Sequence, residues 1–213
     1  MATIAAALGY KTPFSAPFAT PETVDAAKLK FARAWSDHLT LWEAVRQWQR
    51  KQRQRARDFC ARHCLDRDTL RLLDDLARDL VRNLADASVV PRGTSPGAPD
   101  LNLRSQHDAF VAAVIGSGLA PKVALTVAGS PLQCVVADTS ALGHIHPSSV
   151  LKHSQTLQQH PTTRRHLVCY TEKTRTGAGS KVYLRDLTLS SVATAVIFSS
   201  TLDVEHAHHR VVV

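Results

Sequence analysis

The sequence is poor in cysteine and in long apolar segments. Its cysteines, Cys60, Cys64, Cys134 and Cys169, are too few and too scattered for a disulfide-stapled secreted domain, and no signal-peptide pattern opens the chain. The longest apolar stretch, residues 192–198, is far shorter than the ~20 residues that cross a bilayer. We therefore expect a globular chain with reduced thiols, in the cytoplasm or alternatively the nucleus, and no membrane partner.

Positive charge is in excess. The 26 Lys and Arg residues against 18 Asp and Glu give a formal net charge of +8. A basic surface favours a polyanionic partner such as nucleic acid, although composition alone does not select one. A hydrophobic content of 44% suffices for the core of one large domain or two small ones.

Helical periodicity dominates the first half. Residues 1–9 form a short apolar helix that ends before Pro13, and such a helix has no partner of its own, so we expect the chain to begin inside a larger fold. Residues 25–84 continue in a helical pattern, with Asp66 as an expected N-cap. The helix after Asp66 places apolar side chains on one face: Leu70, Leu73, Ala77, Leu80 and Leu84. The pattern predicts a small helical bundle.

A basic stripe accompanies this bundle. Arg46, Arg50, Arg53 and Arg57 are spaced to share one side of a helix, and no acidic residue interrupts them. Three interpretations stay open: contact with nucleic acid, a solvated helix face, or docking to another domain. The tryptophans, Trp35, Trp42 and Trp48, are spaced as core residues more than as base-stacking platforms.

The second half has a different composition. Residues 90–100 hold Pro and Gly without apolar periodicity, which predicts a loop or linker. A helix is expected at residues 105–116. Short β-rich runs follow, at residues 122–127, 132–138, 142–146, 166–172, 181–189 and 194–200, and predict a small barrel or sandwich. The fold class is therefore α+β, a helical bundle followed by an OB-like β-barrel.

Three stretches of the sequence resemble the C-terminal region of DEAH/RHA-type RNA helicases. The first joins KTPF at residues 11–14 to KLKFARAWSDHLTLWEAVRQW at residues 28–48. The second is DLNLRSQHDAFVAAVIGSGLAPKVA at residues 100–124. The third joins HIHPSSV at residues 144–150 to LVCYTEKTRTGAGSKVYLRDLTLSS at residues 167–191. These stretches run in family order and cover nearly the whole chain.

The resemblance implies a division into domains and a set of partners. Residues 1–15 would end a winged-helix domain, residues 16–99 would form the helical ratchet domain, and residues 100–213 an OB-fold domain that starts with a helix. These domains would bind single-stranded RNA and help form the RNA tunnel of an ATP-dependent helicase. The RecA-like lobes, which would hold ATP and Mg²⁺, are missing from this chain, so it would carry no cofactor and no catalytic site. The alternative is an interaction module that anchors the helicase to a ribonucleoprotein such as the small ribosomal subunit.

The most promising RNA contact lies between two expected strands, at residues 171–181. Lys173, Arg175 and Lys181 can neutralise phosphates, while Thr174 and Thr176 offer hydroxyl groups to phosphate or 2′-OH groups. OB-type barrels bind strands through such loops and one exposed face, although an exposed polar hairpin is the plainer interpretation.

The resemblance adds a second contact at the strand end HIHPSS. It places His146 and Ser148 near RNA. In the following strand, Val182 and Leu184 alternate with polar residues and are expected to face the barrel core.

Several apparent catalytic or metal motifs fail on spacing. The string GAGSK at residues 177–181 lacks the spacing of a phosphate loop, and adjacent Ser36, Asp37 and His38 point in different directions on a helix, so an N-cap is the better interpretation of Ser36 or Asp37. His144 and His146 share a strand face, but two ligands do not make a metal site.

The remaining histidine and cysteine clusters also lack partners. Cys60, His63 and Cys64 have no second ligand pair, so buried thiols are expected. The tail histidines, His206, His208 and His209, are expected to be solvated. We therefore predict no metal ion and no nucleotide in this chain.

Overall fold

The computed structural model divides the chain into two compact units. It describes residues 1–51, 53–155, 157, 166–176, 181–191, 193, 194, 197, 203–205 and 210–212. Unit 1 contains residues 1–33 and 38–107, and unit 2 contains residues 34–37 and 108–213. The expected domain boundaries after residues 15 and 99 stay predictions.

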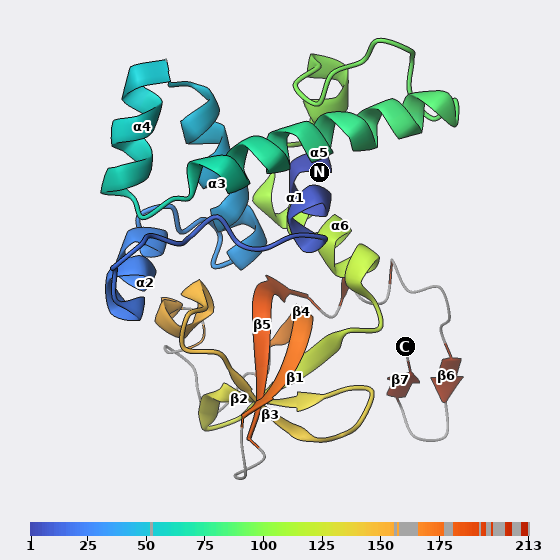
Figure 1. Ribbon diagram of the computed structural model, residues 1–213. Coiled ribbons are helices and arrows are strands. Elements are labelled where there is room, and N and C mark those ends of the chain that lie inside the picture. The colour runs from blue at the N-terminus through green and yellow to red at the C-terminus, as the bar shows by residue number, and fades with distance from the viewer. Residues whose placement is uncertain are drawn as a thin grey trace. The chain divides into compact units, whose positions relative to one another are not determined.

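Unit 1 is helical, as expected (Figure 1). Its α-helices are α1 (Ala2–Leu8), α2 (Pro21–Leu29), α3 (Asp37–Gln49), α4 (Arg53–Arg62) and α5 (Arg67–Asp86), followed by the 3₁₀ helix η1 (Pro99–Asn102). Asp66 caps α5 as predicted, because its Oδ1 accepts a hydrogen bond of 2.6 Å from the backbone N–H of Thr69. None of the described helices is long and apolar enough to cross a membrane.

Aromatic contacts hold the centre of unit 1 together. The ring of Phe31 lies 6.0 Å from that of Phe14 and 5.9 Å from that of Phe59, and the His63 imidazole packs 4.6 Å from the Phe59 ring. The buried face of α5 completes this core with Leu70, Leu73, Ala77, Val81 and Ala85. Leu84, expected on that face, is instead 42% exposed, because the apolar row shifts by one position toward the end of the helix.

The basic stripe predicted along a single helix is wrong. The helix α3 ends at Gln49 and α4 begins at Arg53, so Arg50 lies in the intervening turn. The turn brings the buried residues Val45 and Phe59, from α3 and α4, into one apolar cluster. Burial of that cluster overrides the continuous helical propensity of the sequence, which holds no Gly or Pro at this point.

Unit 2 is a closed β-barrel with a helix before it (Figure 1). The helix α6 (Asp108–Leu119) leads into β1 (Val123–Val127), β2 (Ser130–Val136), β3 (Leu142–Ile145), the 3₁₀ helix η2 (Val150–His153), β4 (Leu167–Thr176) and β5 (Lys181–Ser190). The strands close in the order β1-β2-β3-β5-β4, and β3 pairs with β5 in parallel. The first five predicted strands are thus confirmed.

The predicted sixth strand is wrong where the structure describes it. Thr194 and Ile197 are helical, and a separate strand pair follows, β6 (Asp203–Glu205) with β7 (Arg210–Val212). A short apolar run fits a buried strand or a helix equally well by periodicity, so the sequence pattern alone could not separate them. The expected hairpin tip at residues 177–180 and the tail histidines lie outside the described residues.

The barrel interior is filled by alternate residues of its strands. Val182 is 7% exposed and Leu184 is fully buried, as predicted. Gly143 on β3 permits this close packing, because a Cβ there would lie 3.2 Å from Cγ2 of Val136 and 3.4 Å from Cγ of Leu184. The position of β3 against β5 therefore depends on a residue without a side chain.

A buried carboxylate joins residues 34–37 to the rest of unit 2. Asp37 accepts hydrogen bonds from Ser149 Oγ at 2.6 Å, from the Val150 N–H at 3.1 Å and from the Leu187 N–H at 2.9 Å. Next to it, the Ser36 hydroxyl lies 2.6 Å from the Thr188 hydroxyl. Asp37 is therefore a connector between segments far apart in sequence.

Candidate nucleic-acid interface

The outward face of the barrel carries a row of aromatic and polar side chains across β3, β5 and β4. In the strand register, His144 of β3 lies opposite Tyr183 of β5, and Tyr183 lies opposite Thr174 of β4. Because strand side chains alternate, these residues share the face that is opposite to Leu184 and the barrel core. This row is called the outer face below.

Tyr183 is the centre of the outer face. Its ring lies 5.8 Å from the ring of His144 and 5.7 Å from that of His146, the latter in an edge-on arrangement. Half-buried aromatic rings on the surface of a barrel are the platforms on which single-stranded nucleic acid stacks its bases. The two histidines therefore fix the orientation of a ring that is suited to stacking.

His146 is held by hydrogen bonds at both ring nitrogens. Its Nε2 lies 2.7 Å from a guanidinium nitrogen of Arg185, and its Nδ1 lies 2.7 Å from the hydroxyl of Ser148. The backbone N–H of Ser148 also donates a hydrogen bond to Nδ1, at 3.1 Å. The network fixes the Arg185 side chain on the outer face, and so His146 and Ser148 position this cation.

The predicted hairpin residues separate onto two faces. Thr174 lies opposite Tyr183, and Thr176 lies opposite Lys181, so all of them belong to the outer face. Arg175 lies opposite the buried Val182, and Lys173 lies opposite the buried Leu184, on the other face. Sequence spacing gave the alternation within each strand, but only the register shows which cations share a face with the aromatic ring.

Lys173 is already engaged in an ion pair. Its Nζ donates to the carboxylate of Asp138 at 2.9 Å, and this hydrogen bond raises the pKa of Lys173 and lowers the pKa of Asp138. Among the described residues, no carboxylate pairs with Arg175. A phosphate would have to compete with Asp138 for Lys173, whereas Arg175 and Lys181 have no such competitor in the described part of the chain.

The arginines predicted along one stripe of unit 1 lie in different settings. Arg46 donates to the Glu43 carboxylate at 2.6 Å and 2.9 Å, and its guanidinium lies over the Trp42 ring, 5.5 Å from the centroid. Arg50 is exposed in the turn, and Arg57 is exposed on α4. The side chain of Arg53 lies outside the described part of the structure. The structure therefore places Arg46, Arg50 and Arg57 on α3, in a turn and on α4, and not along one helix.

The cysteine and histidine motifs form no metal centre in the described residues. All four cysteines are free and buried, and burial raises the pKa values of Cys134 and Cys169 to about 12. Thiols with such high pKa values are neutral and unreactive at physiological pH. The prediction that the thiols are buried is confirmed.

Comparison with known proteins identifies the barrel and its relatives. Residues 111–202 match the family model of the oligonucleotide/oligosaccharide-binding (OB)-fold. The human ATP-dependent RNA helicase DHX29 is 29% identical over 97% of this chain, and the Bos taurus ATP-dependent DNA/RNA helicase DHX36 is 31% identical over 95% of it. The Arabidopsis thaliana DExH-box ATP-dependent RNA helicase DExH1 is 32% identical over 94% of it. This chain is a homologue of the DEAH-box RNA helicases.

The helicase homology covers one part of the longer relatives. The chain spans 15% of human DHX29, 20% of Bos taurus DHX36 and 19% of Arabidopsis DExH1. The family resemblance that the sequence motifs indicated is confirmed. The match to the OB-fold region of these helicases supports an accessory role for this chain in a helicase.

Two residues of the outer face, Tyr183 and Arg185, were not among the RNA contacts predicted from the sequence. Tyr183 and Arg185 alternate with the core residues of β5, and this pattern placed them outward without showing what lies beside them. The parallel pairing of β3 with β5 brings His144 and His146 to them. Parallel neighbours are far apart in the sequence, so no local signal could reveal this pairing.

Proposed function

We propose that this chain is the C-terminal accessory region of a DEAH-box RNA helicase and that the outer face of its barrel binds single-stranded RNA. The observation that supports the proposal most directly is the placement of Tyr183 between two histidines, with Arg185 fixed beside it. An aromatic platform next to fixed and mobile cations binds a strand by base stacking and phosphate contacts.

The cations of the outer face have separate roles. Arg185 is oriented by His146, so it offers a phosphate donors in a fixed direction. Lys181, with Thr176 opposite, is exposed at the start of β5 and adds a charge together with a hydroxyl group. Lys173 and Arg175 would contact a strand only where it passes the other side of the hairpin.

In the whole protein this region would help form the RNA tunnel. ATP and Mg²⁺ would bind RecA-like lobes that lie outside this chain, and movement of those lobes would pull RNA past the barrel. The RecA-like lobes would then be a direct partner of this region. The ribosome or another ribonucleoprotein would meet the helicase through surfaces that the barrel face does not use.

The test compares two charge reversals on opposite faces of one hairpin. Lys181→Glu changes the outer face, and Arg175→Glu makes the same change of charge on the other face. We expect Lys181→Glu to weaken binding of a short labelled single-stranded RNA about tenfold, and Arg175→Glu to weaken it less. Fluorescence anisotropy across a salt series measures the affinity, which should fall by about 0.7 log units per log unit of salt for each phosphate neutralised.

Tyr183→Leu tests the stacking step separately. It removes the ring and keeps an apolar side chain, so RNA affinity should fall while the melting temperature changes little. Equal RNA affinities for both charge-reversal variants and the parent chain would reject the outer face as the RNA-binding site. Absence of RNA binding by the parent chain, together with capture of a ribonucleoprotein, would favour the interaction-module alternative.

A further inference from the structure

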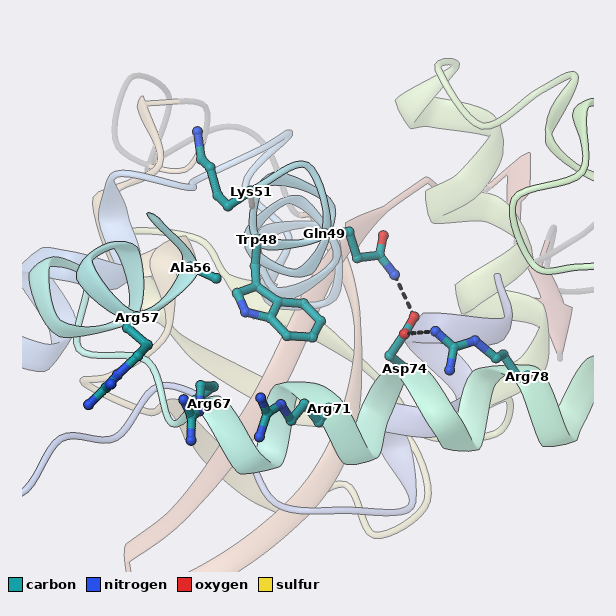
Figure 2. A pocket seen from close by; sticks show the side chains of 9 residues that line it. All are labelled: Trp48, Gln49, Lys51, Ala56, Arg57, Arg67, Arg71, Asp74 and Arg78. Atoms are coloured by element: carbon teal, nitrogen blue, oxygen red, sulfur yellow. Dashed lines mark hydrogen bonds and ion pairs between the residues drawn. The ribbon is translucent and has the colours of Figure 1, made fainter. Parts of the chain in front are cut away.

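A cationic groove in unit 1 surrounds the indole of Trp48 (Figure 2). The groove has a volume of about 660 Å³ and is lined by side chains of α3, α4 and α5 and of the turn between α3 and α4. Figure 2 shows the indole extending from α3 into the space between α4 and α5. A groove of this volume falls in the range of small-molecule and cofactor sites.

The charge of the groove lining is strongly positive. Its cations are Lys51, Arg57, Arg67, Arg71 and Arg78, and its one acidic side chain is Asp74. That carboxylate is occupied, because Asp74 accepts a hydrogen bond from Gln49 at 2.7 Å and pairs with Arg78. The groove therefore offers guanidinium and ammonium donors and no free acceptor to compete with an anion.

Arg57, Arg67 and Arg71 remain available to a ligand, whereas the Lys51 ammonium lies over the Phe59 ring, 5.4 Å from its centroid. Among the described residues, no carboxylate pairs with Lys51 or Arg57. Arg67 and Arg71 approach Asp68 at only 3.8 Å and 3.6 Å, and the Asp68 side chain is 82% exposed. Exposed pairs at these distances are weak, so a phosphate could take both arginines from Asp68.

The indole distinguishes this groove from an ordinary solvated basic face. A solvated face spreads its cations over a convex surface, whereas here the cations and the indole line one hollow. The Nε1 of Trp48 is buried and has no acceptor among the described residues. A groove lined by an aromatic ring and several cations suits a ligand that has both a flat heterocycle and a phosphate.

We infer that the Trp48 groove binds a nucleoside phosphate, with the base against the Trp48 indole and the phosphate between Arg67 and Arg71. Arg57 and Lys51 also line the groove and contribute to its positive potential. The same chemistry has two sources, a free nucleotide or a terminal nucleotide of a single strand. The inference rests on unit 1 alone and holds whether or not the barrel binds RNA.

The first experiment separates the contribution of the base to the binding affinity from that of the phosphate. The 213-residue chain is titrated by calorimetry with AMP, with ribose 5-phosphate and with inorganic phosphate. We expect AMP to bind at least about tenfold more tightly than ribose 5-phosphate, because only AMP stacks on the indole. AMP should also quench tryptophan fluorescence, and Trp48→Leu should abolish that quenching. Equal affinities for AMP and ribose 5-phosphate without quenching would overturn the inference.

The protein arm uses two matched charge reversals on α5. Arg71→Glu changes the groove, while Arg82→Glu makes the same change on the same helix outside the groove lining, at a side chain that is 69% exposed. Arg71→Glu should weaken AMP binding about tenfold or more, and Arg82→Glu should leave it unchanged. Both variants retain charged, exposed helix positions, so neither should unfold the bundle. AMP binding that is unchanged in Arg71→Glu would reject the site.

Competition identifies the source of the ligand. A 5′-phosphorylated single-stranded RNA is added to the AMP complex of Lys181→Glu, which weakens the proposed barrel contact. Displacement of AMP assigns the groove to a strand end, and failure to displace AMP assigns it to a free nucleotide. Binding of an oligo-glutamate peptide in the absence of AMP binding would mean a docking site for acidic peptide and would overturn the inference.

Discussion

Donors from two distant parts of the chain meet at the carboxylate of Asp37. Its partners, Ser149, Val150 and Leu187, belong to the segment after β3 and to β5. Asp37 is 3% exposed, so water cannot replace it as an acceptor. A buried polar group without its partner costs about 1–3 kcal/mol, which makes this carboxylate a sensitive point of unit 2.

We predict that Asp37→Ala lowers the free energy of unfolding of unit 2 by roughly 2–4 kcal/mol, because two backbone N–H groups and a hydroxyl lose their acceptor. Chemical denaturation followed by circular dichroism measures the change. Asp100→Ala serves as the control, since Asp100 is exposed in η1. A change below about 0.5 kcal/mol, the range of surface substitutions, would contradict the role of Asp37 as a connector.

His63 should make the stability of unit 1 depend on pH. Burial lowers the pKa of His63 below its ordinary value of 6.5, and its Nδ1 is buried with no partner among the described residues. The unfolded chain therefore binds this proton more tightly than the folded chain does. This contribution to stability is complete above pH 6.5 and declines as the pH falls through 6.5 toward the lower folded-state pKa.

We expect His63→Phe to reduce the loss of melting temperature between pH 7.5 and pH 5.5, because the substitution keeps a ring against Phe59 and removes the titrating group. Melting curves at the two pH values give the comparison. His107→Phe, at an exposed position of the same unit, should keep the parent's pH dependence. An identical pH dependence in His63→Phe and the parent would exclude His63 as the cause.

At the scale of elements, β5 carries the centre of the barrel core. We predict that Leu184→Ala destabilises the barrel by about 2–5 kcal/mol, because Leu184 is fully buried and its loss leaves a cavity. Leu132→Ala on β2 is the matched control, since Leu132 is 41% exposed and should change stability by less than about 0.5 kcal/mol. Thermal melting of both variants measures the change, and equal melting temperatures for Leu184→Ala and Leu132→Ala would contradict the burial of Leu184 in the core.

The sequence pattern was sufficient for most elements of this fold. Alternating and helical periodicity located the first five strands, the helix after Asp66 and its cap, because these features depend on neighbours close in sequence. The turn after Gln49 was missed, since it is set by the packing of Val45 with Phe59 and not by a local breaker. Helix propensity is a weak signal when tertiary burial opposes it.

The candidate sites could be predicted only in part. Residue types identified Lys181, Thr174 and Thr176 as possible contacts, but the register that places them with Tyr183 depends on pairing between strands. The groove around Trp48 combines α3, α4 and α5, and no spacing within one helix indicates it. Periodicity gives the face of each element, while the partner of that face is a property of the whole fold.

For the whole molecule, we predict that the purified chain hydrolyses no ATP, with or without RNA. The sequence has no phosphate loop, and the one carboxylate that lines the Trp48 groove, Asp74, is already bonded to Gln49 and Arg78, so no group there is placed to hold Mg²⁺. Phosphate release over several hours provides the measurement. RNA-stimulated release that follows the chain through purification would mean that a catalytic site exists in it.

The connection made by Asp37 also affects how the barrel is completed during synthesis. Residues 34–37 leave the ribosome before the rest of the barrel. Asp37 accepts a hydrogen bond from the Leu187 N–H, which lies 150 residues further along the chain. At the usual rate of about 5–20 residues per second, the carboxylate waits on the order of 10 s for this donor. A barrel expressed from residue 108 onward would lack the Asp37 carboxylate. A shortened gene for the barrel would therefore have to encode residues 34–37 as well.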